Sequence, residues 1–224
     1  MNQIAQWVLP DELTAPYPAQ AVELLSRYFY TTLDDGSPAY TGAMFERFAG
    51  GGDATEVADT FTPADLVAVS LLSVDVPGAA ALRIFGRDAE NLNGLLERIP
   101  IDLGLCDAGE ADIGPGSPAD ELWFSIRRCG VGPVTTSKLL ARKRPRLLPV
   151  IDTVVKEVLG HPAKASFWLT LRAHLAADDG RLTEQLIAIR DQAGLPNISV
   201  IRCFDVLVWM IGKRDGIGDT RGRY

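Results

Sequence analysis

The residues with the clearest capacity for chemistry lie in one basic segment of an otherwise acidic chain. The 224 residues include 22 lysines and arginines against 29 aspartates and glutamates, for a net charge of −7. Residues 127–146 contain no acidic residue, and the rest of the chain has 15 basic against 29 acidic residues. A local excess of positive charge is typical of a polyanion contact, and the alternative is a solvated basic face paired with acidic neighbours. The segment's basic residues are Arg127, Arg128, Lys138, Arg142, Lys143, Arg144 and Arg146.

Two glycines in this segment, Gly130 and Gly132, predict a sharp turn between two helices. Glycine permits positive φ and lets a phosphate approach the backbone without meeting a Cβ. The amides at the start of the second helix, together with the helix dipole, would form an anion site. Lys138 lies on that helix, with Arg142 one turn further along the same face. The pattern would grip a DNA backbone without reading its sequence, whereas a glycine turn packed into the core is the plainer interpretation.

The segment 118–160 resembles the signature of the helix-hairpin-helix DNA glycosylase superfamily. Residues 130–137 read Gly-Val-Gly-Pro-Val-Thr-Thr-Ser, and residues 149–160 read Pro-Val-Ile-Asp-Thr-Val-Val-Lys-Glu-Val-Leu-Gly. The shared features are the Gly-x-Gly hairpin followed by threonine, a short extended link, and an aspartate before Thr, two apolar residues, a basic residue and Leu-Gly. The N-terminal half resembles, more loosely, an uncharacterised bacterial domain family.

The resemblance implies a role for Asp152, the residue that matches the superfamily's aspartate. In that superfamily the carboxylate stabilises the positive charge that develops on the sugar as a flipped base leaves, or orients the attacking water. Asp152 also stands where a helix N-cap belongs, and aspartate is a favoured cap. Val134 occupies the position of the Schiff-base lysine of bifunctional members, so lyase chemistry through that position is excluded. The resemblance implies that the DNA backbone is bound by Gly130, Gly132, Val134, Thr135, Lys138, Arg142 and Lys143.

The elements that must position these residues predict an all-α protein with two lobes. The connector at 104–117, with four glycines and one proline, separates a lobe at 1–104 from a hairpin lobe at 105–212, and a flexible tail follows at 213–224. The glycine cluster at Gly50–Asp53 is a candidate mobile loop. Helical spacing and caps predict helices near 19–30, 62–74, 77–85, 88–99, 118–129, 133–143, 152–160, 164–177, 181–193 and 198–211, although the last is β-branched enough to allow a strand.

Several ligand classes are not expected from this composition. Three scattered cysteines, expected to be reduced core thiols, cannot hold the four-cysteine iron–sulfur cluster of many glycosylases, and two histidines make no zinc site. We therefore expect neither cofactor nor metal. No apolar run of membrane length and no signal peptide is present, which predicts a cytoplasmic protein. Three aromatic residues could stack on a flipped base, although such residues are more often core: Trp123, Phe124 and Trp168.

Three functions remain open from the sequence. The first is a monofunctional DNA glycosylase, the second a nucleic-acid-binding module without catalysis, and the third an unrelated α-helical protein-interaction domain. Double-stranded DNA, held by backbone contacts, is the expected partner for the first two. The sequence indicates neither the base removed nor an oligomeric state.

Overall fold

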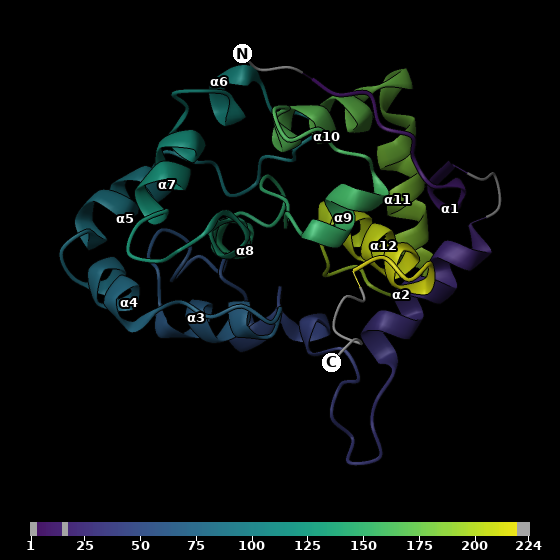
Figure 1. Ribbon diagram of the computed structural model, residues 1–224, viewed down its shortest axis with the longest axis horizontal. Coiled ribbons are helices and arrows are strands. Elements are labelled where there is room, and N and C mark those ends of the chain that lie inside the picture. Colours follow the sequence, from purple (N-terminus) through teal and green to yellow (C-terminus); the bar gives the residue numbers. More distant parts are fainter. Residues whose placement is uncertain (1–3, 15–17, 219–224) are drawn as a thin grey trace. The chain divides into compact units, whose positions relative to one another are not determined.

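The computed structural model describes residues 4–14 and 18–218 and is entirely α-helical in its regular elements (Figure 1). Over these residues the chain forms twelve α-helices and three short 3-10 helices, and the pairing of Thr32 with Pro38 is an isolated bridge. The prediction of an all-α class is therefore confirmed. No helix in the described residues is both long and apolar enough to cross a membrane.

The chain divides into two compact units, and the first joins residues 1–40 to residues 151–224. Its central element is α12, which contacts α2, α9 and α11. Eleven of the fifteen residues of α12 are buried, so the apolar 198–211 segment is a core helix and not a strand. The helices of this unit are α1 (Asp11–Thr14), α2 (Ala19–Tyr30), α9 (Thr153–Val158), α10 (Phe167–Ala176), α11 (Arg181–Gln192) and α12 (Val200–Arg214), with a 3-10 turn at Asp178–Gly180.

The second unit, residues 41–150, is arranged around α8. Figure 1 shows α8 nearly end-on, with α3, α4, α5 and α7 around it, and α8 contacts both α3 and α7. All residues of α8 from Thr136 to Lys143 are buried, which is unusual for a helix that ends in two cations. The helices are α3 (Pro63–Ser70), α4 (Gly78–Phe85), α5 (Ala89–Glu97), α6 (Glu110–Ile113), α7 (Pro118–Ile126) and α8 (Pro133–Lys143), with 3-10 turns at Thr41–Met44 and Phe48–Gly50.

These units differ from the lobes predicted at 1–104 and 105–212. Residues on both sides of the 104–117 connector pack together inside the second unit, since α5 contacts α7 and α3 contacts α8. The connector itself contains α6. The chain instead leaves the first unit after residue 40 and returns to it at residue 151. Of the predicted tail, residues 213–218 continue α12 and a turn, and 219–224 lie outside the described residues.

The helix starts follow from capping chemistry that the sequence predicts. At α3, the backbone N–H of Thr62 donates to the Asp65 carboxylate at 2.8 Å, and Pro63 occupies the first turn. At α7, the Ser117 hydroxyl accepts from the Asp120 amide at 3.2 Å. The start predicted at Pro133 coincides with that of α8. Several predicted helices end one turn early, because the last residues of each form 3-10 or turn structure.

Candidate nucleic-acid interface

The turn between α7 and α8, residues 127–132, exposes two of the basic residues of the segment, Arg127 and Arg128. Gly130 has a φ of 84°, as a left-handed position requires, whereas Gly132 has an extended φ of −83° that any residue can adopt. Cys129 also has a positive φ and its thiol is exposed, so the prediction of three core thiols is wrong for this residue. A Cβ added to Gly132 would meet nothing within 4 Å, so the backbone here is open to an approaching group.

The first amides of α8 point to the outside of the helix end. The amide of Thr136 already donates to the carbonyl of Gly132, at 2.9 Å, in the first α-helical hydrogen bond. The amides of Val134 and Thr135 precede that bond and have no acceptor among the described residues. Both residues are half-buried, and Gly132 is exposed. This helix end therefore offers unpaired donors and the positive end of an eleven-residue dipole.

Two arginines and two aromatic rings precede these amides in the chain, in the last turn of α7 and directly after it. Arg127 and Arg128 are exposed, and neither forms an ion pair in the part of the chain that the structure describes. The Arg127 guanidinium lies over the Trp123 ring at 5.5 Å from its centroid, which orients the cation. Phe124 is 58% exposed, which is unusual for a large apolar ring. Trp168, the third aromatic candidate, is buried in the other unit.

The other predicted contacts of this interface, Lys138, Arg142 and Lys143, lie inside the second unit. Their exposed fractions are 4%, 1% and 0%. Lys138 Nζ donates to the carbonyl of Leu72 at 2.8 Å. In this conformation none of the three presents its charge to an external phosphate. The physical reason is that α8 is the central helix of its unit, so even its polar residues face other parts of the chain.

Arg142 binds the segment that precedes α3. Its Nε donates to Asp65 Oδ1 at 3.1 Å, and its two terminal nitrogens donate to the carbonyls of Phe45, Glu46 and Phe48 at 2.6–3.0 Å. Burial lowers the pKa of Arg142, and the negative charge of Asp65 opposes that shift. The backbone of Gly52 also packs against Arg142, since a Cβ there would lie 2.4 Å from the Arg142 carbonyl oxygen. The candidate mobile loop at Gly50–Asp53 is therefore packed on α8 at Gly52.

Lys143 and Arg144 continue this pattern with nearly every donor satisfied. Lys143 Nζ donates to the carbonyls of Val57 and Thr60 and to Asp65 Oδ2 at 3.2 Å, which uses all three of its N–H groups. Arg144 donates to carbonyls at the end of α5 and to the Asp59 carboxylate. Burial lowers the pKa of the Lys143 ammonium, and Asp65 counteracts it. Three consecutive cations thus hold an irregular segment that has few hydrogen bonds of its own.

The sequence did not predict that these three cations hold the irregular segment, although two of its features are consistent with that role. Asp65 lies in the first turn of α3, where its carboxylate caps the helix, yet the same carboxylate also accepts hydrogen bonds from Arg142 and Lys143. Cations at the C-terminal end of a helix would ordinarily be explained by its dipole. An irregular stretch such as residues 45–62 leaves many carbonyls without helical partners, and those that are buried need donors from elsewhere in the chain.

Asp152, the predicted catalytic residue, lies in the first unit as the N-cap of α9. Its Oδ1 accepts from the Val154 amide at 2.9 Å, so the capping role is confirmed. The side chain is half-buried. Burial raises the pKa of Tyr28, and the charges of Asp205 and Asp152 add to this shift while Arg202 opposes it. Asp152 therefore lies within electrostatic range of a buried polar network on α2 and α12.

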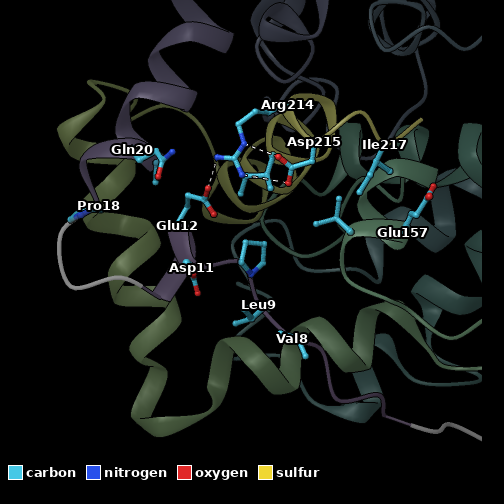
Figure 2. Close-up of a pocket in the computed structure, with 14 residues that line it drawn as sticks. Val8, Leu9, Asp11, Glu12, Pro18, Gln20, Glu157, Arg214, Asp215 and Ile217 are labelled. Carbon is cyan, nitrogen blue, oxygen red and sulfur yellow. Dashed lines mark hydrogen bonds and ion pairs between the residues drawn. The ribbon is translucent and has the colours of Figure 1, made fainter. Parts of the chain in front are cut away.

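The first unit also contains a cavity of about 580 Å³ between its N-terminal segment and the ends of α9 and α12. Figure 2 shows Arg214 at its wall, hydrogen-bonded to Glu12 and Asp215, with Glu157 and Ile217 beyond them. These two carboxylates raise the pKa of Arg214. Because the guanidinium is already engaged by two acidic groups, the cavity wall is acidic overall and does not suit a polyanion.

Comparison with known proteins identifies a family whose function is unknown. The fold class is all-α in two units, and the chain belongs to a family of unknown function (DUF6308), whose model matches residues 21–212. A family model of the helix-hairpin-helix glycosylases does not match. No curated protein and no solved structure matches the chain. Membership therefore spans residues of both compact units and assigns no chemistry to either.

Proposed function

We propose that the protein binds the backbone of a nucleic acid, in the first place double-stranded DNA, through the turn between α7 and α8. The observation that supports this is the coincidence of exposed Arg127 and Arg128 with unpaired amides at the start of α8. Phosphate oxygens are bound by such amides and by flanking arginines, without base contacts. Because Lys138, Arg142 and Lys143 are buried, the proposed interface is smaller than the sequence predicted and consists of this turn alone.

Within this proposal, Phe124 adds a base-stacking contact to the phosphate contacts of the turn. Phe124 precedes Arg127 and Arg128 by three and four residues, and exposed aromatic rings in a positively charged surface are the usual means of stacking on an unpaired or displaced base. Base–aromatic stacking is worth about 1–3 kcal/mol, so Phe124→Ala should weaken binding to a duplex that contains an abasic-site mimic. The same variant should change binding to an intact duplex much less, because paired bases are not available for stacking.

The test is fluorescence anisotropy of a labelled duplex carrying an abasic-site mimic, measured across a salt series. Replacing both arginines, Arg127→Gln with Arg128→Gln, should weaken binding at least tenfold, since charged hydrogen bonds contribute about 1.5–3 kcal/mol each. The slope of log affinity against log salt should fall by about 1.8, which corresponds to two fewer phosphate contacts.

A matched control removes two other exposed arginines of the same unit, Arg87 and Arg98, which are paired with Asp88 and Glu121. The control has the same change in net charge, so an equal loss of affinity in both double variants would refute the turn as the binding site. Absence of binding even at low salt would refute nucleic-acid binding altogether. Arg142→Glu is unsuitable as a test, because this buried side chain supports the fold.

Base excision is the activity that the glycosylase resemblance adds to this proposal, with Asp152 as the carboxylate. Its support is that Asp152 is a partly exposed carboxylate at a helix start, the place that the resemblance assigns to it. Asp152→Asn is a clean test, because asparagine caps a helix about as well as aspartate but carries no charge. A damaged-base cleavage screen should show activity in the native chain and none in this variant, with unchanged thermal stability. A native chain inactive on every lesion tested would leave a binding protein without catalysis.

A further inference from the structure

The N-terminal segment Ile4–Leu9, here called the strap, is held on the first unit without helix or strand structure of its own. The Ala5 amide donates to the Thr170 hydroxyl at 3.0 Å, and the Trp7 amide donates to His174 Nε2 at 3.1 Å. The Trp7 indole N–H donates to His161 Nδ1, also at 3.1 Å. Trp7 is only 4% exposed, so one large side chain anchors the strap.

Both histidines of the chain are therefore acceptors for the same residue. A ring nitrogen accepts a hydrogen bond only when it carries no proton. His161 Nε2 lies 3.2 Å from the Ala165 carbonyl, which fixes its proton on Nε2 and leaves Nδ1 as the acceptor. The His174 ring stacks on Trp7 with centroids 5.1 Å apart and planes 5° from parallel. The docked strap thus requires two neutral imidazoles.

We propose that the strap is a pH-sensitive latch, closed by neutral His161 and His174 and released when they are protonated. Protonation of either ring replaces an acceptor by a second donor that faces the N–H group of Trp7. Each protonated ring loses one hydrogen bond from Trp7, so protonation of both leaves, of the three bonds named above, only that to Thr170. In the docked state the Trp7 ring packs against apolar rings, with the ring centroids of Phe167 and Phe204 at 5.1 and 6.2 Å from its own.

The charged groups around the two rings offer little stabilisation to a protonated imidazole. The charge of Lys156 on α9 opposes protonation of His161. The cavity that His174 lines includes Asp178 and Arg181, which are of opposite sign. Burial lowers the pKa of both histidines below the ordinary 6.5, in keeping with their neutral form in the docked state.

The direction of the pH effect follows from these lowered values. The released state, with histidines of ordinary pKa, binds more protons than the docked state. Docking is therefore complete above about pH 6.5 and weakens as the pH falls towards the lower pKa values of the docked rings. Each histidine increases the opening constant by up to about tenfold per pH unit in this window, so both together give up to about a hundredfold.

Release of the strap would change two cavities of the first unit. Val8 and Leu9 line the cavity of Figure 2, and Gln6, Leu9 and His174 line a second cavity of about 240 Å³. The strap is thus one wall of each, and its release in acid would remove that wall from both. This inference is independent of nucleic-acid binding, which involves residues of the other unit.

The test is NMR of the full chain labelled with ¹⁵N-histidine and ¹⁵N-tryptophan, titrated from pH 8 to pH 4. At high pH, His161 should carry its proton on Nε2 and His174 on Nδ1. Both rings should titrate below 6.5, and the Trp7 indole signal, assigned with Trp7→Phe, should move to its solvent position in the same range. The Trp209 signal, from a half-buried ring of the same unit that packs against Tyr28, should keep its native position.

Three outcomes would overturn the latch. They are titration of either docked ring at 6.5 or above, a Trp7 signal that stays native after both rings are protonated, and simultaneous loss of the native Trp209 signal. The variant Trp7→Phe distinguishes the hydrogen bonds of the two histidines. It removes the indole donor to His161 but keeps the backbone amide that donates to His174. It should raise the pKa of His161 towards 6.5 more than that of His174, whereas the control Trp209→Phe should leave both values unchanged.

Discussion

Asp65 is the single negative group on which two buried cations of α8 converge, and its removal gives the sharpest prediction of stability. In Asp65→Asn the side chain keeps its size and one acceptor for the Thr62 amide, but Arg142 and Lys143 lose their counter-charge. Asp65 is 1% exposed and the two cations are 1% and 0% exposed, so solvent cannot compensate. Breaking a buried ion pair costs about 3–5 kcal/mol. That is a large part of the roughly 5–15 kcal/mol that stabilises a typical domain.

A matched control isolates the capping part of this effect. Asp112 makes the same cap at α6, accepting from the Gly109 amide at 2.7 Å, and forms no ion pair with a buried cation among the described residues. Asp112→Asn should cost well under the roughly 2 kcal/mol upper limit for loss of a cap. Urea unfolding followed by ¹⁹F NMR of fluorotryptophan resolves the second unit, because Trp123 lies there and Trp7, Trp168 and Trp209 lie in the first.

The pH dependence of Asp65→Asn offers an independent readout. Burial already lowers the pKa of Lys143, and loss of Asp65 removes the attraction that opposes this shift. The native variant then binds fewer protons than its unfolded form, so its stability should rise as the pH approaches the ordinary lysine value from below. The reasoning is refuted if Asp65→Asn costs no more than Asp112→Asn, or if its penalty is the same at pH 7 and pH 9.

Three further predictions concern glycine positions, which have no side chain. Gly212→Ala should destabilise the first unit by about 1–3 kcal/mol in thermal unfolding, because the new Cβ would lie 2.5 Å from a Val154 methyl group. Gly94→Ala, in the middle of α5 with nothing within 4 Å, should instead stabilise the second unit by about 0.5–1 kcal/mol, and equal effects of the two would refute this distinction. Gly52→Ala should destabilise the second unit by at least about 1–3 kcal/mol, since the backbone oxygen of Arg142 occupies the space of the Cβ; a neutral result would show that Gly52 is not packed there.

The burial of Lys138, Arg142 and Lys143 means that much of the positive charge of the basic segment is not on the protein surface. Of its seven basic residues, Arg127, Arg128 and Arg146 are exposed and four are buried. The net charge of −7 is therefore accompanied by a surface that is more acidic than the composition alone indicates. Any polyanion must approach the turn at Arg127 and Arg128 locally, and binding should be weak at physiological salt for that reason.

The local elements could be predicted from the sequence because their signals are local. Thr62-Pro63 and Ser117-Pro118 begin helices where capping chemistry requires, and α8 spans the predicted 133–143. Asp152 caps α9 as its position after an extended link indicates. The interactions that decide these features join residues two to four positions apart, so neighbouring residue types are sufficient to specify them.

Which residues face solvent was decided by the tertiary structure alone. The sequence shows a cation at the end of a helix in the same way whether that cation binds a phosphate or a buried carbonyl. Arg142 donates to the carbonyls of Phe45, Glu46 and Phe48, which lie nearly a hundred positions earlier in the chain. The division into units is equally non-local, because residues 1–40 join a core formed by residues 151–224. The sequence determined the all-α class, the helix starts and the position of the exposed glycine turn. The packing of α8 at the centre of its unit determined that most of the positive charge serves the fold, because buried carbonyls and Asp65 satisfy the donors that the sequence assigned to DNA.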